Sequence, residues 1–325
     1  MNIYDIAEKS GVSVSTVSRV INGTARVREE TKQKVLSVIR DTGFQPNAFA
    51  QALNFNSMGM IGVLCTNFAD SYYSRVVAHL EKHLRDNNLN VTLVCPGQTI
   101  AEKKEGIRAL KAKGVDAIVL IGATFLELER EFIADISATC PLFTLSYHHL
   151  DLPNVHSVCC DERGAVKDVV TKLIAAGLPR VLFVCEHIQN SNNTKYSGYR
   201  DAYEACGLPL PELLLPTGCY TAEAEPIIAD FLAANADRID AVMTGNDELA
   251  AFTLKAMHRL GISRPVVGFN NSLLSQQVIP ELTSVDNRVE EMCRLTAANL
   301  VAKLQKQEVP QRTVISAELV RRESF

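Results

Sequence analysis

Short apolar runs alternate with amphipathic segments of helical period from Met60 onwards, and this alternation constrains the fold most. The runs interpreted as strands are Met60–Cys65, Asn90–Cys95, Ala117–Ile121, Leu142–Ser146, Val155–Cys160, Val181–Cys185, Leu213–Leu215, Ala241–Met243, Pro265–Phe269 and Thr313–Ser316. The series restarts after Gly177. Strands that are joined by helices pair in parallel, so we predict two doubly wound parallel sheets side by side. In that architecture a ligand binds at the carboxyl ends of the strands, between the two halves.

The N-terminal part of the chain has a different pattern, with three short helices and no strand. Ile3–Ser10 is predicted as a helix that ends at Gly11, because glycine supplies the positive φ of a tight turn. Ser13 is predicted to cap a second helix, and Glu29–Thr42 forms a third with one apolar face. This order is typical of a helix-turn-helix unit.

The second helix of this unit has two distinct faces at 100° per residue. The buried face is predicted to hold Val17, Val20 and Ile21, and the adjacent face holds Val14, Ser15, Ser18 and Arg19. The adjacent face begins at the helix N-terminus and has short side chains there, as entry into a major groove requires. Val14 can contact a thymine methyl, Ser15 a base edge and Arg19 a guanine. The alternative is a solvated face of an ordinary three-helix bundle.

A short segment after Gln45-Pro46 is predicted as a marginal helix, with Pro46 near its first position. Asn47–Asn54 spans only about two turns, which is too short to be stable alone in water. Leu53 on its apolar surface could act as a wedge in a minor groove. The alternative is a simple linker. The predicted division is a headpiece over 1–45, a hinge over 46–58 and a core over 59–325. The core divides into one half over 59–160 with part of 288–325, and another over 161–287 with the rest.

Composition and charge limit the class of protein. An apolar content of 47% with 22% charged residues is ordinary for a globular protein. Residues 1–58 hold seven Lys or Arg against five Asp or Glu, a net of +2, and the rest holds 26 against 32, a net of −6. A headpiece more basic than its core suits DNA binding. The sequence lacks a membrane-spanning run and a signal peptide, so we expect a cytoplasmic protein without a membrane partner.

The motifs of enzymes and metal sites are absent from the sequence. There is no Gly-x-Gly-x-x-Gly, no phosphate loop and no Gly-x-Ser-x-Gly. The nine cysteines are scattered, and we expect them to fill the core. His79 and His83 have the spacing of a metal pair without a third ligand, so a solvated helix face is the better interpretation. We therefore expect no catalytic residue, no metal and no cofactor.

Amide, carboxylate and aromatic side chains follow several of the predicted strands. They include Asn67, Asp70, Tyr72, Tyr73, Asn190, Asn192, Asn193, Lys195, Tyr196, Asn246, Asp247, Asn270 and Asn271. Such groups suit a polyhydroxylated ligand, because its hydroxyls need paired donors and acceptors while its ring faces stack on aromatic rings. The alternative, for each Asn or Asp taken singly, is a helix cap.

The chain resembles the LacI/GalR family of bacterial transcriptional repressors from Ile3 to Ser324. The most specific residues are Ile3-Tyr4-Asp5-Ile6-Ala7, Gly11-Val12-Ser13, Thr16-Val17-Ser18-Arg19-Val20-Ile21-Asn22-Gly23 and Gln45-Pro46-Asn47-Ala48. Thr244-Gly245-Asn246-Asp247, Val267-Gly268-Phe269 and Glu318-Leu319-Val320-Arg321-Arg322-Glu323-Ser324 resemble motifs of the family's core. The resemblance implies a periplasmic-binding-protein-like core behind the DNA-binding headpiece.

The resemblance also assigns roles to particular residues. The implied base contacts are Val14, Ser15, Arg19 and, in the minor groove, Leu53. The implied phosphate contacts are Tyr4, Ser13, Thr16, Asn22, Arg28 and Asn47. The candidate effector-binding residues are Asn67, Tyr72, Tyr73, Ser146, Lys195, Asn246 and Asn270. The implied partners are double-stranded operator DNA, a small sugar or sugar phosphate, and a second copy of the chain in a homodimer.

Two departures from the family pattern bear on the ligand. Lys195 stands where relatives usually have Arg, and Asn270 where they usually have Asp. Ser157–Ala165 and Leu282–Asp286 look most like trehalose repressors, although that group's phosphate-binding arginines have no counterpart that we can place. We therefore expect a dimeric, ligand-responsive repressor. The alternative is a cytoplasmic sugar-binding or sugar-processing α/β protein whose helical head has a partner other than DNA.

Overall fold

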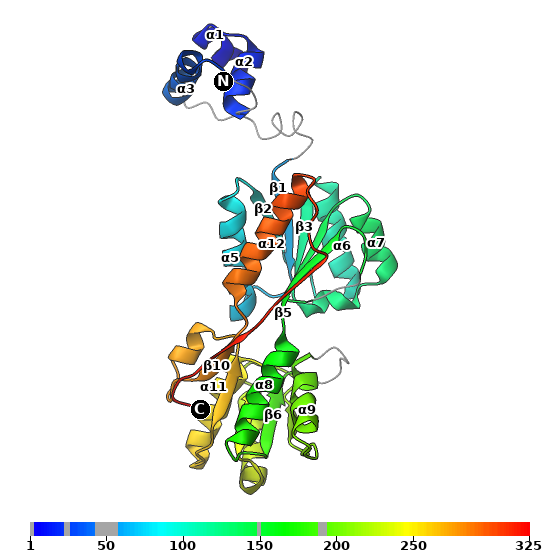
Figure 1. Cartoon of the computed structure of the whole chain (residues 1–325), viewed down its shortest axis with the longest axis vertical. Helices are drawn as coiled ribbons and strands as arrows, with labels where there is room; N and C mark the ends of the chain where they lie inside the picture. Colours follow the sequence, from blue (N-terminus) through cyan, green and yellow to red (C-terminus); the bar gives the residue numbers. More distant parts are fainter. Residues whose placement is uncertain (1–2, 23–26, 43–57, 148–150, 188–193) are drawn as a thin grey trace.

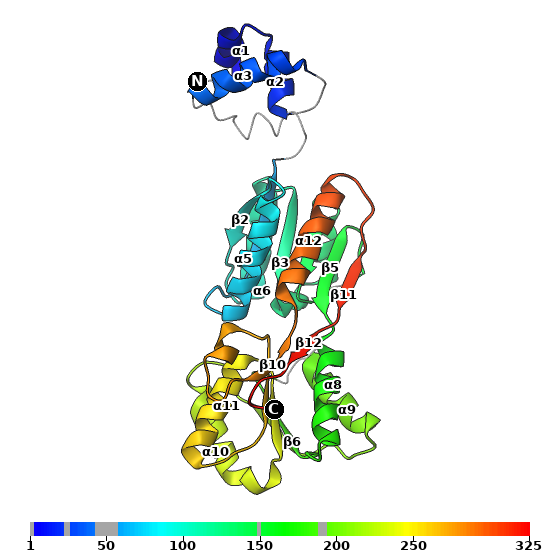
Figure 2. The same ribbon diagram turned by 60° about the vertical axis from the view of Figure 1, so that its left-hand side comes forward.

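The computed structural model of the chain describes residues 3–22, 27–42, 58–147, 151–187 and 194–325 (Figure 1). After a helical headpiece, the core consists of two α/β lobes stacked end to end (Figure 2). We call them the N-lobe, which contains β1, and the C-lobe, which contains β6. Each lobe has a six-stranded sheet, so the predicted architecture is confirmed.

The N-lobe sheet has the order β11-β5-β4-β3-β1-β2, with every pairing parallel. Its strands are β1 (Met60–Cys65), β2 (Asn90–Val94), β3 (Ala117–Ile121), β4 (Leu142–Leu145), β5 (Val155–Cys160) and β11 (Arg312–Ile315). Its helices are α5 (Ser71–Arg85), α6 (Ile100–Ala112), α7 (Arg130–Ser137), α12 (Val289–Leu304) and the 3₁₀ turn η1 (Ala123–Glu127).

The C-lobe repeats this plan with the order β12-β10-β9-β8-β6-β7. Its strands are β6 (Val181–Cys185), β7 (Leu214–Pro216), β8 (Ala241–Thr244), β9 (Val266–Phe269), β10 (Thr283–Asp286) and β12 (Glu318–Val320). Its helices are α8 (Glu162–Ala175), α9 (Thr194–Ala205), α10 (Ala224–Asn235), α11 (Asp247–Leu260) and the 3₁₀ turns η2 (Ala236–Arg238) and η3 (Leu273–Gln276). The chain passes between the lobes three times: from β5 to α8, from β10 to α12 and from β11 to β12.

Two strands were not predicted from the sequence. β10 was missed because Thr283 and Ser284 look polar, yet both are fully buried: Thr283 N–H donates to Ser324 Oγ at 2.8 Å, and Ser284 Oγ donates to Asp247. β12 has only three residues and pairs antiparallel with β10. The C-lobe sheet is therefore parallel except for the β10–β12 pairing at this edge.

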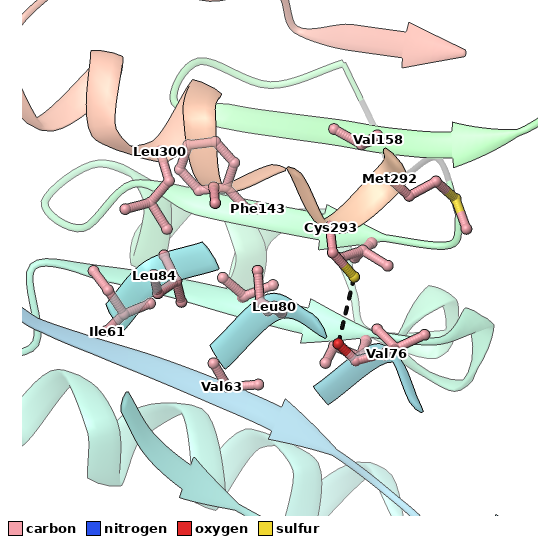
Figure 3. Packing of buried hydrophobic residues seen from close by; sticks show 14 of the residues in the cluster. Ile61, Val63, Val76, Leu80, Leu84, Phe143, Val158, Met292, Cys293 and Leu300 are labelled. Carbon is pink, nitrogen blue, oxygen red and sulfur yellow. Dashed lines mark hydrogen bonds between the residues drawn. The ribbon is translucent and has the colours of Figure 1, made fainter. Parts of the chain in front are cut away.

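The N-lobe core joins its sheet to α5 and α12. Val76, Leu80 and Leu84 of α5 are fully or almost fully buried against Ile61 of β1 and Leu300 of α12 (Figure 3). Truncation of one such leucine to alanine costs about 2–5 kcal/mol. This packing fixes the N-terminal turn of α5 against the sheet, and that turn faces the C-lobe (Figure 2).

The cysteines fill space in most cases, as expected. Cys65, Cys140, Cys159, Cys185 and Cys293 are buried thiols. Cys95 is exposed, so the expectation is wrong there: it lies just beyond β2, the edge strand of the N-lobe sheet. In the described part of the chain, no helix is both long and apolar enough to cross a membrane.

Candidate functional site

The headpiece is built on a small apolar core shared by α1 (Ile3–Ser10), α2 (Val14–Asn22) and α3 (Glu29–Thr42). Ile6, Val17 and Val35 are completely buried in it. Gly11 has the predicted positive φ, at 62°. The three predicted helices are confirmed, and the burial of Val17 orients the rest of α2.

The N-terminal turn of α2 carries a cluster of hydroxyls. Ser13 Oγ accepts the Thr16 backbone N–H at 3.2 Å, which confirms the predicted cap. The same oxygen lies 2.8 Å from Ser15 Oγ and 2.9 Å from Thr16 Oγ1. A helix N-terminus carries a partial positive charge, so this turn can approach a phosphate with hydroxyl and N–H groups together.

Several of the proposed DNA-contacting side chains that the structure describes lie on the surface of the headpiece. Ser15 and Arg19 are exposed on α2, and Val14 is half-buried beside them. Tyr4 is 69% exposed, and Arg28 is exposed just before α3. The Asn22 side chain, Asn47 and Leu53 lie outside the described residues, so their assigned roles stay predictions.

Tyr72 and Tyr73 form the N-lobe wall of the cleft between the lobes. The Tyr72 hydroxyl lies 2.5 Å from Ser146 Oγ, just beyond the end of β4. Tyr73 packs on Gly122, whose φ is 96° and where a Cβ would lie 2.6 Å from the ring. The two rings meet edge to face at 5.5 Å. Burial raises the pKa of both phenols, so they act as neutral hydrogen-bonding groups.

Lys195 at the start of α9 forms the opposite wall. Its Nζ donates to the Gly245 carbonyl at 2.9 Å and lies 3.6 Å from Glu162 Oε1. It also stands over the Phe269 ring, 4.0 Å from the centroid. Three C-lobe segments therefore hold this ammonium, and its side chain is only 19% exposed.

Tyr220 reaches across the cleft from the segment after β7. Its hydroxyl accepts a hydrogen bond from Asn67 Nδ2 at 3.1 Å and also bonds to Asp70. Burial, followed by the charge of Asp70, raises the pKa of Tyr220. Asp70 also caps α5 by accepting the backbone N–H groups of Tyr72 and Tyr73. Closure of the cleft is thus linked to the start of α5.

A second bridge between the lobes involves Arg75 of α5. Its guanidinium donates to the carbonyls of Asn270 and Asn271, both at 3.0 Å. Nearby, Ser71 Oγ donates to Glu248 Oε1 at 2.5 Å. A hollow of about 340 Å³ opens beside these contacts. It is lined by Ser71, Tyr72, Ser74, Arg75, Asn270, Ser272 and Leu273.

Asn246 and Asn270 are both held within the C-lobe. Asn246 Oδ1 caps α11 by accepting the Leu249 N–H at 2.8 Å, so the capping interpretation applies to this oxygen. Asn270 is 9% exposed, and its Oδ1 accepts from Asn287 Nδ2 at 3.0 Å. Its φ is 99°, and Ser146 in the N-lobe has a φ of 77°. Both residues directly follow corresponding strands, β9 and β4, so the duplicated folds place a left-handed residue on each side of the cleft.

Glu186, Tyr220 and Arg75 are among the cleft residues that reasoning from the sequence missed. Glu186 directly follows β6, and Tyr220 follows β7, so the rule of inspecting strand ends could have found both. Arg75 lies on the first turns of α5 and reaches the other lobe, which a single sequence does not reveal. Among the described residues, no group of three or more His, Cys, Asp or Glu could hold a metal ion, and the His79–His83 pair gains no third ligand.

Comparison with known proteins agrees with this architecture. Residues 2–47 match the model of bacterial regulatory proteins of the lacI family, and residues 170–325 match a periplasmic binding protein-like domain. An HTH-type transcriptional regulator of Lachnoclostridium phytofermentans is 38% identical over 331 residues, covering 100% of this chain and 99% of the relative.

Two solved structures share the fold over the whole chain. The lac repressor dimer bound to operator and the anti-inducer ONPF has a TM-score of 0.84 at 21% identity, covering 100% of this chain and 98% of that one. A complex of the transcriptional regulator CelR with cellobiose has a TM-score of 0.70 at 24% identity and covers 100% of both chains.

These matches decide between the two classes of function considered above. The full-length relative is a transcriptional regulator, and the family is not one of enzymes, which confirms the expectation that the chain is no enzyme. The helix-turn-helix headpiece and the two-lobed core are those of a DNA-binding regulator with a sugar-binding-like effector domain. The chain belongs to the lacI family of bacterial transcriptional regulators.

Proposed function

We propose that the protein is a repressor that binds a palindromic operator as a homodimer and is controlled by a small carbohydrate in the cleft between its lobes. The observation that carries the proposal is the surface of α2, where Ser15 and Arg19 are exposed above the buried Val17. A capped helix N-terminus lies beside them. The solved lac repressor, a dimer bound to operator, supports the dimeric arrangement.

Within the headpiece, we propose that Val14, Ser15 and Arg19 read bases. The proposed phosphate contacts are Tyr4, Ser13, Thr16, Asn22, Arg28 and Asn47. We further propose that residues 46–58 form the hinge, that Leu53 enters the minor groove, and that 59–325 senses the ligand and forms the dimer. We propose that the protein acts at the chromosome, in the cytoplasm.

Within the core, we propose that the ligand contacts Asn67, Tyr72, Tyr73, Ser146, Lys195, Asn246 and Asn270. The CelR complex with cellobiose supports a carbohydrate as the class of ligand. The Asn67–Tyr220 and Arg75–Asn270 bridges would rearrange when a ligand enters between the lobes. A ligand that prefers one arrangement of the lobes shifts the equilibrium between the arrangements by the difference between its affinities for them. A 10⁴-fold difference in affinity corresponds to about 5.5 kcal/mol of free energy. A trehalose-related ligand stays a prediction from the two sequence segments.

Selection of genomic fragments on the purified full-length protein tests the proposal. We expect one palindromic sequence to be enriched, with binding that weakens steeply as salt rises, because phosphate contacts release counterions. A matched selection with Arg19→Ala should lose the preference at one position of each half-site and keep the rest of the consensus. If no palindrome is enriched, with or without sugars present, the proposal is wrong.

A further inference from the structure

Three carboxylates stand around the cleft and limit the charge of its ligand. Asp70 precedes α5, Glu162 begins α8 and Glu186 directly follows β6. They come from both lobes. Burial raises the pKa of Glu186, the neighbouring His187 opposes this rise, and the charge of Asp70 in the other lobe adds to it. The negative charges of the two lobes therefore act on each other across the cleft.

The cations of the cleft are already engaged. Lys195 is held by Glu162, the Gly245 carbonyl and the face of Phe269. Arg75 donates to two backbone carbonyls, and Glu248 accepts a hydrogen bond from Ser71, one helical turn before Arg75. The charges of Arg75 and Glu248 cancel. The three carboxylates and the Lys195 ammonium then sum to a net charge of −2 for these described residues.

Such a cleft treats a sugar hydroxyl and a phosphate group differently. A phosphate ester carries about −1.5 to −2 charges at pH 7 and would meet like charges in partly desolvated surroundings. A sugar hydroxyl instead donates to a carboxylate, and the rings of Tyr72, Tyr73 and Tyr220 can cover the apolar faces of a pyranose. Resting on the function proposed above, we infer that the cleft accepts an uncharged saccharide and rejects its phosphate ester, with Glu186 as the main residue that excludes phosphate.

Glu186 has this role because the other two carboxylates of the cleft are already hydrogen bonded within the protein. Both Asp70 and Glu162 already accept hydrogen bonds, Asp70 from two backbone N–H groups and Glu162 from Thr194 Oγ1 at 3.0 Å. The Glu186 carboxylate lies 3.5 Å from His187 Nε2, and its side chain is 40% exposed. It is therefore the carboxylate of the three best able to meet a ligand.

Isothermal titration calorimetry with paired probes tests the inference on the full-length protein. The pairs are glucose, trehalose and cellobiose, each with its 6-phosphate. We expect at least one uncharged sugar to bind and its 6-phosphate to bind at least tenfold more weakly, a difference of about 1.4 kcal/mol. Glu186→Gln should reduce this ratio severalfold, whereas the control Glu204→Gln, at an exposed position near the end of α9, should preserve it.

Three results would overturn the inference: tighter binding of a 6-phosphate, failure of every uncharged sugar to bind, or a ratio unchanged by Glu186→Gln. Fragment selection on the same preparation separates this outcome from failure of the proposed function. An enriched palindrome together with tighter phosphate binding rejects only the inferred ligand class. Preference for uncharged sugar without an enriched palindrome rejects only the proposed operator binding.

Discussion

The Tyr72 hydroxyl lies 2.5 Å from Ser146 Oγ, and this hydrogen bond ties the first turn of α5 to the end of β4. Ser146 adopts a left-handed backbone with a φ of 77°. Such a conformation costs a non-glycine residue about 1–2 kcal/mol. The bond and the strain occur together at the N-lobe wall of the cleft, where a ligand would meet both residues.

Substitution of Ser146 separates the bond from the strain. Ser146→Ala leaves the buried Tyr72 hydroxyl without its partner, so the free energy of unfolding should fall by about 1–3 kcal/mol. Ser146→Gly loses the same bond but relieves the backbone, and should lose about 1 kcal/mol less. Urea unfolding of both variants measures this, and equal losses would show that the strain has no cost here.

Gly122 is required for the position of Tyr73. An added Cβ would lie 2.6 Å from the Tyr73 ring, in a backbone with a φ of 96°. Gly177→Ala is a matched control, because its φ is 83° but nothing lies within 4 Å of the added Cβ. The control should cost about 1–2 kcal/mol from backbone strain alone. Gly122→Ala should cost more in thermal and urea unfolding and should weaken ligand binding; a cost no larger than that of the control would contradict the proposed contact.

Arg75 should hold the lobes together. Arg75→Met removes the charged donors to the carbonyls of Asn270 and Asn271, and hydrogen bonds to charged groups contribute about 1.5–3 kcal/mol. We expect a larger radius of gyration in small-angle X-ray scattering and faster amide exchange at the start of α5. Arg294→Met is the control, because Arg294 pairs with Glu291 within α12. Identical scattering of both variants and the wild type would argue against the bridge.

Arg19 should carry specificity for the operator. Arg19→Ala is expected to weaken binding to the cognate site by about 1–3 kcal/mol and to relax the preference at one base pair. Arg40→Ala removes an equal charge from an exposed position on α3 and should weaken binding to all sequences alike. Fluorescence anisotropy with matched and mutated operators measures both effects. Full retention of specificity in Arg19→Ala would remove its assigned role.

Acid should weaken the C-lobe through Asp240. Hydrogen bonds from Arg180 hold the pKa of Asp240 below its usual range. A carboxyl whose pKa is lower in the folded state adds stability above its unfolded pKa of about 3.9 and loses it as pH falls through the lower, folded value. Arg180→Gln should therefore have a lower Tm than the wild type at pH 7, and the difference should be smaller at the lowest pH at which both proteins still fold, although the hydrogen bond from Arg180 to the Asp237 carbonyl is lost at either pH. A constant difference between these pH values would exclude this linkage.

Most strands and helices were predictable because their apolar patterns are local. The missed strand β10 shows the limit, since Ser284 is buried only because Asp247, distant in sequence, accepts its hydroxyl. The residues of the cleft were predictable in part, because some of them follow strands with a local apolar pattern. Asn67 and Tyr72 follow a recognisable strand, but the reach of Arg75 into the other lobe depends on how the lobes are stacked. For Asn246, chemical type left a ligand contact and a helix cap both open, and the structure shows that its amide oxygen caps α11.

We propose that a carbohydrate in the cleft controls DNA binding by the headpiece. The most direct measurement is the dissociation constant of the selected operator, determined by fluorescence anisotropy with and without the uncharged sugar that binds in calorimetry. We predict a change of at least tenfold, about 1.4 kcal/mol, in the full-length protein. An operator affinity that stays the same at a saturating concentration of that sugar would contradict control by the ligand.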